Sequence, residues 1–244
     1  VGPSAVKLLG WRVEIEPWRG VVLGGSRVLQ WGGEGRPQTL GSLARAILGI
    51  DNFEANMDRS LEPGNQLAGF DARWTLPWGE PLRFTLNGQA IGEDEAGHMP
   101  SRYVVSGGGE VAGTLADGTA LRVFGELADT QIDRWFRGSG FAGSAYHHPL
   151  YPAGYVQRNQ PLAYPAGGDV RIASLGLAAQ RGPTRLLLML HRGDEGRRGL
   201  AGELRRAFDG GPAVALAATE WHDALGRERG LQVRVEIPLE RLRD

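Results

Sequence analysis

The chain has 244 residues, a formal net charge of -1, and a hydrophobic fraction of 41%. This near balance of charge argues against a general electrostatic attraction to nucleic acid. There is no cysteine, which excludes disulfides and thiolate metal sites, and no run approaches the roughly 20 apolar residues of a membrane helix. A membrane β-barrel stays possible, because its strands are apolar on one face only.

Alternating apolar and polar residues mark several strands, in chain order at residues 9–16, 70–76, 82–90 and 231–239. In the last of them Leu231, Val233 and Val235 share one face, opposite Gln232 and Arg234, as the two-residue period of a strand requires. We expect strands of about 10 to 13 residues, longer than the usual 5 to 6 of soluble sheets and close to tilted membrane strands. The fold class predicted is all-β, an antiparallel up-and-down transmembrane β-barrel, with Val235 facing lipid near the middle of the bilayer.

Three segments are less regular than these strands. The apolar residues of Asp169–Gln180 change parity between Ile172 and Leu175, which indicates a bulge or a misread strand. Glu203–Phe208 could form a strand or a single helical turn. Thr39–Leu48 carries an apolar stripe that predicts a short helix, with a structural plug as its default role.

Tight turns and longer polar loops alternate along the chain. The turns are expected at Pro17–Gly20, Pro77–Glu80, Ala116–Gly118, Arg181–Pro183 and Asp209–Pro212. The longer loops are expected at residues 33–64, 93–101, 130–168, 193–199 and 223–230. In an antiparallel chain this order places every long loop at one end of the sheet, as in outer-membrane barrels, whose short turns face the periplasm.

Aromatic residues lie near both ends of the expected strands. Trp18 and Trp78 lie at short turns, while Trp31, Tyr103 and Trp221 lie near long loops. This placement predicts two interfacial girdles, although tryptophan also flanks turns in soluble sheets.

The number of expected strands is about eleven, and bacterial barrels use an even number with both termini in the periplasm. The last strand ends on the short-turn side, whereas the first, Val6–Glu16, begins on the long-loop side. We therefore expect residues 1–244 to be a single barrel region, incomplete at the N-terminus.

Several segments together resemble the capsule assembly Wzi family. They are Gln30–Pro37 (QWGGEGRP), Asp51-Asn52, Glu62–Asp71 (EPGNQLAGFD), Ile91–Gly97 (IGEDEAG), His147–Tyr155 and Gly167-Gly168-Asp169. The resemblance begins near Gly10 and covers most of the chain. It implies an outer-membrane β-barrel of roughly eighteen strands, located in the cell outer membrane, that acts as a lectin for capsular or exopolysaccharide and has no catalytic role. Family members are about twice as long, so the chain would be the C-terminal part of the larger barrel, with outer-membrane lipid around it.

The loop at residues 130–168 is richest in groups that bind sugars, since aromatic faces pack on sugar rings while polar groups fix the hydroxyls. The candidate carbohydrate-binding residues are Trp135, Tyr146, His147, Tyr151, Tyr155, Glu93, Asp94 and Glu95. Alternatively, the aromatic residues fold the loop over the barrel mouth as a plug. No catalytic residue, metal site or cofactor is expected: neighbouring acids on a strand point to opposite sides, and the adjacent pair His147 and His148 has no third ligand at suitable spacing.

Two other functions stay open from the sequence. The first is an outer-membrane porin or polysaccharide exporter with the same architecture, in which the charged lumen matters more than the loops. The second is a soluble all-β glycan-active enzyme, because a one-sided soluble sheet gives the same alternation of residues.

Overall fold

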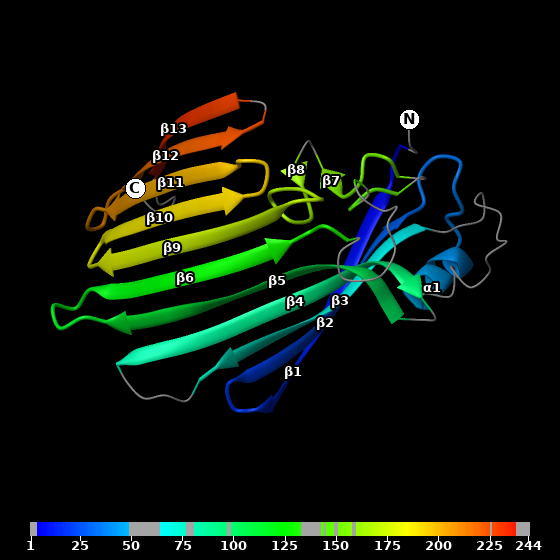
Figure 1. Cartoon of the computed structure of the whole chain (residues 1–244), viewed down its shortest axis with the longest axis horizontal. Coiled ribbons are helices and arrows are strands. Elements are labelled where there is room, and N and C mark those ends of the chain that lie inside the picture. The colour runs from blue at the N-terminus through cyan, green and yellow to red at the C-terminus, as the bar shows by residue number, and fades with distance from the viewer. Residues whose placement is uncertain are drawn as a thin grey trace. The chain divides into compact units, whose positions relative to one another are not determined.

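The computed structural model describes residues 4–48, 64–76, 81–96, 99–132, 143, 145–148, 151–157, 160–224 and 226–237. Its elements are β1 (Lys7–Trp18), β2 (Val21–Trp31), α1 (Leu40–Leu48), β3 (Gly64–Thr75), β4 (Leu82–Ala96), β5 (Met99–Thr114), β6 (Ala120–Asp129), β7 (Val156–Gln157), β8 (Gln160–Pro161), β9 (Arg171–Arg181), β10 (Thr184–Gly193), β11 (Arg198–Ala207), β12 (Ala213–Asp223) and β13 (Gly226–Glu236). All strands except the β7–β8 hairpin join one 11-stranded sheet in the order β1-β2-β3-β4-β5-β6-β9-β10-β11-β12-β13 (Figure 1). This sheet confirms the all-β prediction and the count of about eleven strands. The helix expected at residues 39–48 is also present, as α1. No helix within the described ranges has the length and apolar character needed to cross a membrane.

The chain divides into two compact units. The first consists of residues 1–73, 88–106 and 128–170 and contains β1, β2, α1, β7 and β8. The second consists of residues 74–87, 107–127 and 171–244 and contains β9 to β13. Strands β3 to β6 each contribute residues to both units.

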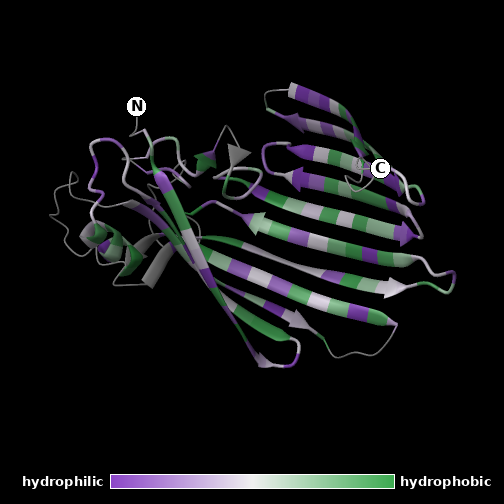
Figure 2. Ribbon diagram, turned by 180° about the vertical axis from the view of Figure 1, so that it is seen from behind, coloured by the Kyte–Doolittle hydropathy of each residue, from purple (hydrophilic) through white to green (hydrophobic). Residues whose placement is uncertain are grey.

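One face of β9–β13, here called the apolar face, is formed by rows of leucine and valine. The antiparallel register aligns Leu175, Leu190 and Leu200 in one row and Leu186, Leu204, Leu216 and Val233 in another. Leu200 is 53% exposed and Val233 is 62% exposed, so these side chains do not pack into a core of the described structure. Figure 2 shows the alternation of hydrophobic and hydrophilic residues along these strands. A row of exposed aliphatic side chains on a long strand is the surface that a barrel presents to lipid.

The opposite face of the same strands carries ion pairs that reach over a whole strand. Arg205 on β11 binds Glu236 on β13 at 2.7 Å, and Arg234 on β13 binds Glu203 on β11 at 3.1 Å. The intervening strand β12 places Ala215, 3% exposed, in register between Arg205 and Arg234. Alanine on the middle strand leaves room for long side chains to meet above it.

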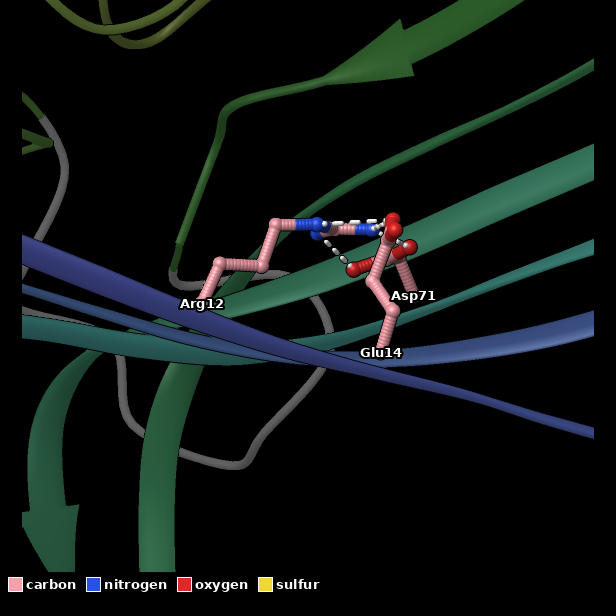
Figure 3. Close-up of polar contacts among 3 residues, drawn as sticks. All are labelled: Arg12, Glu14 and Asp71. Carbon is pink, nitrogen blue, oxygen red and sulfur yellow. Dashed lines mark hydrogen bonds and ion pairs between the residues drawn. The ribbon is translucent and has the colours of Figure 1, made fainter.

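The first unit repeats this arrangement with glycine in place of alanine. Arg12 on β1 binds Asp71 on β3 across β2, and also binds Glu14 at 2.7 Å (Figure 3). Glu14 is in register with Gly24 of β2. A Cβ atom on Gly24 would lie 2.5 Å from Asp71 Oδ2 and 2.6 Å from Arg12 Nη2. Gly24 is therefore the residue that lets this ion pair form.

Three of the five expected long loops are wrong. Residues 93–101 belong mostly to β4 and β5, residues 194–197 alone connect β10 and β11, and residues 226–230 belong to β13. In β13 the polar residues that suggested a loop are paired across strands, because Glu220 binds Arg227 at 2.6 Å and Arg229 at 3.0 Å. The connections at residues 32–63 and 130–170 are long, as predicted. The expected turn at Pro77–Glu80 lies outside the described residues.

One further expectation from the sequence is wrong, and one of two alternatives that it left open is confirmed. The pairing of β9 with β10 is regular from Ile172 to Arg181, without a bulge; the parity changes because Ile172, 6% exposed, faces inward while Leu175 is exposed on the apolar face. Glu203–Phe208 forms strand, not a helical turn, up to Ala207. Trp31 is 7% exposed and Trp221 shares the face of Ala215, so neither forms an interfacial girdle, whereas Trp18 at a short turn is 69% exposed.

Candidate carbohydrate-binding loop

The connection between β6 and β9, here called the β6–β9 loop, is fixed at its base by Thr130 and Val170. The Thr130 amide donates to the Val170 carbonyl at 2.9 Å, and the Val170 amide donates to Thr130 Oγ1 at 2.9 Å. Both residues are buried, at 2% exposure each. Buried backbone groups need such partners, so the two ends of the loop are held together where it leaves the sheet.

Two carboxylates hold the backbone of the loop. Asp169 accepts the Gly143 amide at 2.9 Å and the Ala145 amide at 3.2 Å, and its own φ is 57°. Glu93 at the end of β4 accepts the Tyr146 amide at 2.7 Å. Hydrogen bonds from an amide to an ionised carboxylate are among the stronger ones. The acids near the loop therefore shape its backbone.

A buried chain of hydrogen bonds ties the loop to β2 and β3. Gln30 on β2 donates to the Gly154 carbonyl at 2.7 Å and accepts from Asn65 Nδ2 at 3.1 Å. The Asn65 carbonyl accepts from the Tyr155 hydroxyl at 3.0 Å, so the chain runs from the loop through two strands and back to the loop. Tyr151 adds a fourth contact by donating its hydroxyl to the Gly32 carbonyl at 3.1 Å.

The Tyr155 hydroxyl is a neutral donor, and the Tyr146 hydroxyl is neutral as well. Burial raises the pKa of the Tyr155 hydroxyl far above its ordinary value, and the nearby Glu93 carboxylate raises it further. Burial likewise raises the pKa of the Tyr146 hydroxyl, with Glu93 again the second cause. Because desolvation disfavours the phenolate, both hydroxyls keep their proton at every physiological pH.

The structure brings Glu93, Tyr146, His147, Tyr151 and Tyr155 into one region. Tyr151 and Tyr155 are both 3% exposed, so they have little surface to offer a sugar and hold the loop instead, as the plug alternative expects. His147 is exposed and Tyr146 is half-buried. Sugar binding by the candidate residues stays a prediction. Trp135 and the side chains of Asp94 and Glu95 lie outside what the structure describes.

Sequence reasoning missed Gln30, Asn65, Asp169 and Gly154. All four lie in the segments that carry the family resemblance, but the pattern gave no reason to pair them across the chain. Gly154 has a φ of 65°, and a Cβ atom there would lie 2.5 Å from the Tyr146 carbonyl oxygen. A glycine inside an aromatic-rich loop is the signal that could have pointed to this close approach.

The helix in the other long connection packs against the start of the sheet. Leu29, Trp31 and Ala46 form a buried cluster with Leu9 and Leu43 around it. Trp31 Nε1 donates to Ser42 Oγ at 3.2 Å. The helix is therefore attached to β2 by apolar contacts and one hydrogen bond. Within the described ranges, no group of His, Asp and Glu side chains is arranged to hold a metal ion.

Residues 3–241 match the family described as capsule assembly protein Wzi. A solved structure of similar fold is that of Wzi from Escherichia coli, described as an outer membrane protein involved in group 1 capsule assembly and as a carbohydrate-binding β-barrel. Its TM-score is 0.68 at 25% identity, over 97% of this chain and 54% of that protein. An uncharacterised 55.8 kDa protein in the cps region of Klebsiella pneumoniae is 44% identical over 106 residues, which are 42% of this chain and 19% of that protein.

The chain thus spans about half of the solved relative and a smaller part of the Klebsiella protein. The match extends over nearly the whole chain, in sequence and in fold. It confirms the resemblance inferred from the quoted segments and the expected location in the outer membrane. The chain belongs to the capsule assembly protein Wzi family of outer-membrane proteins.

Proposed function

We propose that this chain forms part of a non-enzymatic outer-membrane barrel that holds exported capsular polysaccharide at the cell surface through the β6–β9 loop. The observation that carries the proposal is the attachment of this loop by two carboxylates and a buried amide and tyrosine chain. A loop that is already ordered loses less conformational entropy when it binds a ligand. The described relative from Escherichia coli is a carbohydrate-binding barrel, which supports the same ligand class here.

Within the loop, the exposed residues are the proposed contacts and the buried ones are the proposed supports. His147 and Gln157 are exposed and offer hydrogen bonds to hydroxyls. Trp135, Asp94, Glu95 and Tyr146 belong to the proposed contact surface on chemical grounds. Tyr151 and Tyr155 act indirectly, by fixing the backbone that carries the contacts.

The proposed absence of catalysis follows from the use of Glu93. One oxygen of this carboxylate accepts the Tyr146 amide at 2.7 Å, whereas glycoside hydrolysis needs two carboxylates free to meet the glycosidic bond. Glu93→Gln keeps an acceptor oxygen and is expected to leave polymer retention unchanged. Glu93→Ala removes the acceptor and is expected to reduce retention by releasing the loop. Measured cleavage of polysaccharide by the folded protein, lost in Glu93→Gln, would establish an enzyme instead.

We also propose that the 11 strands are part of a larger, roughly eighteen-stranded barrel. In the described sheet β1 and β13 each have a single hydrogen-bonded neighbour, and strand edges with unpaired backbone groups are not tolerated in lipid. The solved relative is nearly twice as long as the matched region. Further strands between β13 and β1 would close the barrel, and we propose that they come before β1, with this chain as the C-terminal part.

The test uses the full-length protein, produced in cells that export capsule and purified in detergent. His147→Ala with Gln157→Ala is expected to lower surface-retained polymer and the affinity of purified protein for the polysaccharide by about tenfold, since each removes hydrogen bonds to hydroxyls. Arg181→Gln, at a short turn between β9 and β10, is the matched control and should leave both unchanged. Heat-modifiable mobility on gels checks that each variant is folded. Unchanged retention in the loop variant would contradict the proposal and move binding to the charged face.

A further inference from the structure

A row of basic side chains crosses one end of the apolar face. Arg192 on β10, Arg198 on β11, His222 on β12 and Arg227 on β13 are consecutive partners in the register. Since neighbouring strands lie about 4.8 Å apart, the row extends for about 14 Å. Arg229 lies two residues further along β13, on the same face.

This row borders the hydrophobic surface directly. The next residues along the same face are Leu190 and Leu200, both 53% exposed. In the register, eight residues of β10 separate Arg192 from Thr184, whose partners are Arg181 and Arg206. At about 3.3 Å per residue this is about 26 Å along the strand, or about 20 Å along the membrane normal at a strand tilt of about 40°, and the long arginine side chains extend outward from there toward the edges of an apolar band of about 25 Å. The two boundaries of the membrane are therefore marked by two basic ends of the apolar face, one with Arg192 and Arg198 and the other with Arg181 and Arg206.

The row lies at the end of β9–β13 where β9 begins, directly after the long β6–β9 loop. Arg192 pairs with Ala173, two residues after the start of β9 at Arg171. Long loops of outer-membrane barrels face the outside. The basic row is thus placed at the head-group level of the outer leaflet.

The charges in the row are only partly neutralised by the described part of the chain. Arg192 and Arg198 are exposed and make no ion pair within the described part of the chain. Glu220 pairs with Arg227 at 2.6 Å and with Arg229 at 3.0 Å, so four arginines share one carboxylate on this face. Of the acids in the adjoining β10–β11 turn, Asp194 accepts the Arg171 amide at 3.1 Å and Glu195 is exposed at the tip.

We infer that this basic row binds the phosphate groups of outer-leaflet glycolipid, that is, of lipopolysaccharide, while the lipid's acyl chains lie on the leucine rows below. Guanidinium groups match phosphate oxygens with paired hydrogen bonds, and clusters of arginine at the membrane boundary recognise anionic head groups. An amphipathic phospholipid-like ligand fits better than capsular polymer, because polymer has no apolar part to cover Leu190 and Leu200. Glu220 holds Arg227 and Arg229 in place between the head group and the apolar rows.

The test measures binding of bis-phosphorylated lipid A to the folded full-length protein in detergent, by native mass spectrometry and by titration. Arg192→Gln with Arg198→Gln is expected to weaken binding by about tenfold or more. The same change in charge at the opposite boundary, Arg181→Gln with Arg206→Gln, is the control and should have no effect. If the glutamine variant does not fold, Arg192→Lys with Arg198→Lys keeps the charge and should show an intermediate loss.

Three outcomes would overturn the inference. Equal binding of lipid A stripped of its phosphates would show that only the acyl chains are held. Equal competition by inorganic phosphate would show a site for a free ion, and displacement of the lipid by capsular polysaccharide would assign the row to the polymer. Polymer retention should be unchanged in the Arg192 and Arg198 variant, so failure of this inference is distinguishable from failure of the proposed function.

Discussion

The buried hydrogen-bond chain predicts how much the β6–β9 loop depends on a single hydroxyl. Tyr155→Phe removes the donor to the Asn65 carbonyl, which is 3.0 Å away in a residue that is 4% exposed. A buried acceptor left without a partner costs about 1–3 kcal/mol, and about 2 kcal/mol corresponds to roughly a thirtyfold change in an opening equilibrium. Gln30→Leu orphans two buried groups at once, the Gly154 carbonyl and the Asn65 amide, and is expected to cost about twice as much.

Hydrogen exchange on the folded full-length protein in detergent measures this opening locally. The Gly154 amide, which donates to the Tyr151 carbonyl at 2.8 Å, should exchange about thirtyfold faster in Tyr155→Phe, whereas amides of β10 and β11 should not change. Val156→Thr is the matched control, because Val156 follows directly in sequence and is 45% exposed. The combined variant with Gln30→Leu should cost less than the sum, since both residues act in one chain. Unchanged exchange at Gly154 in both single variants would refute the role assigned to this chain.

Three further predictions follow from the register, the glycine and one turn. Leu188→Arg, midway between the two basic ends of the apolar face, is expected to destabilise the barrel by about 2–4 kcal/mol. Val235→Arg is expected to cost only about 0–1 kcal/mol, because Val235 shares a row with Arg206 at one of these ends. Equal costs in urea unfolding would contradict this depth assignment and restore the expectation of Val235 at mid-bilayer. Gly24→Ala should disrupt the ion pair between β1 and β3 and lower the urea unfolding midpoint slightly, and this loss should disappear in an Asp71→Asn background. A hydrogen bond from the Thr119 amide lowers the pKa of the Asp117 carboxyl below its ordinary 3.8. The ionised carboxylate therefore stabilises the folded state above pH 3.8, and this stabilisation is lost as the pH falls through the lowered pKa. Asp117→Asn should flatten the acid unfolding curve in this pH range, and an unchanged curve would exclude the contribution.

The strands were predictable because a two-residue period is a local property of the sequence. Leu231, Val233 and Val235 alternate with polar residues, and the structure exposes all three on one face. The loops at residues 193–199 and 223–230 were wrong for a physical reason. Polar residues end a strand only when nothing pairs them, and in β13 the arginines at 227 and 229 are paired by Glu220 on the adjacent strand.

The candidate site was harder to predict because its order comes from contacts between distant segments. Gln30 and Gly154 are 124 residues apart in the chain, and Tyr155 and Asn65 are 90 apart. Composition correctly placed tyrosines in a loop near the sheet, but it could not tell a buried tyrosine that holds the loop from an exposed one that meets a sugar. The distinction depends on which rings the strands cover, a property of the fold.

The two faces of β9–β13 also differ in how the charges of their arginines are balanced. On the charged face the arginines of β11 and β13 are satisfied by Glu203 and Glu236, and the small residues of β12 make those pairs possible, so that face is largely self-complementary. At the outer end of the apolar face, Arg192 and Arg198 are exposed and make no ion pair within the described ranges. Exposed cations that border an apolar surface suit a ligand that carries both an anionic group and an apolar part. A phosphorylated glycolipid at the membrane surface has both the charge and the apolar chains that match this boundary.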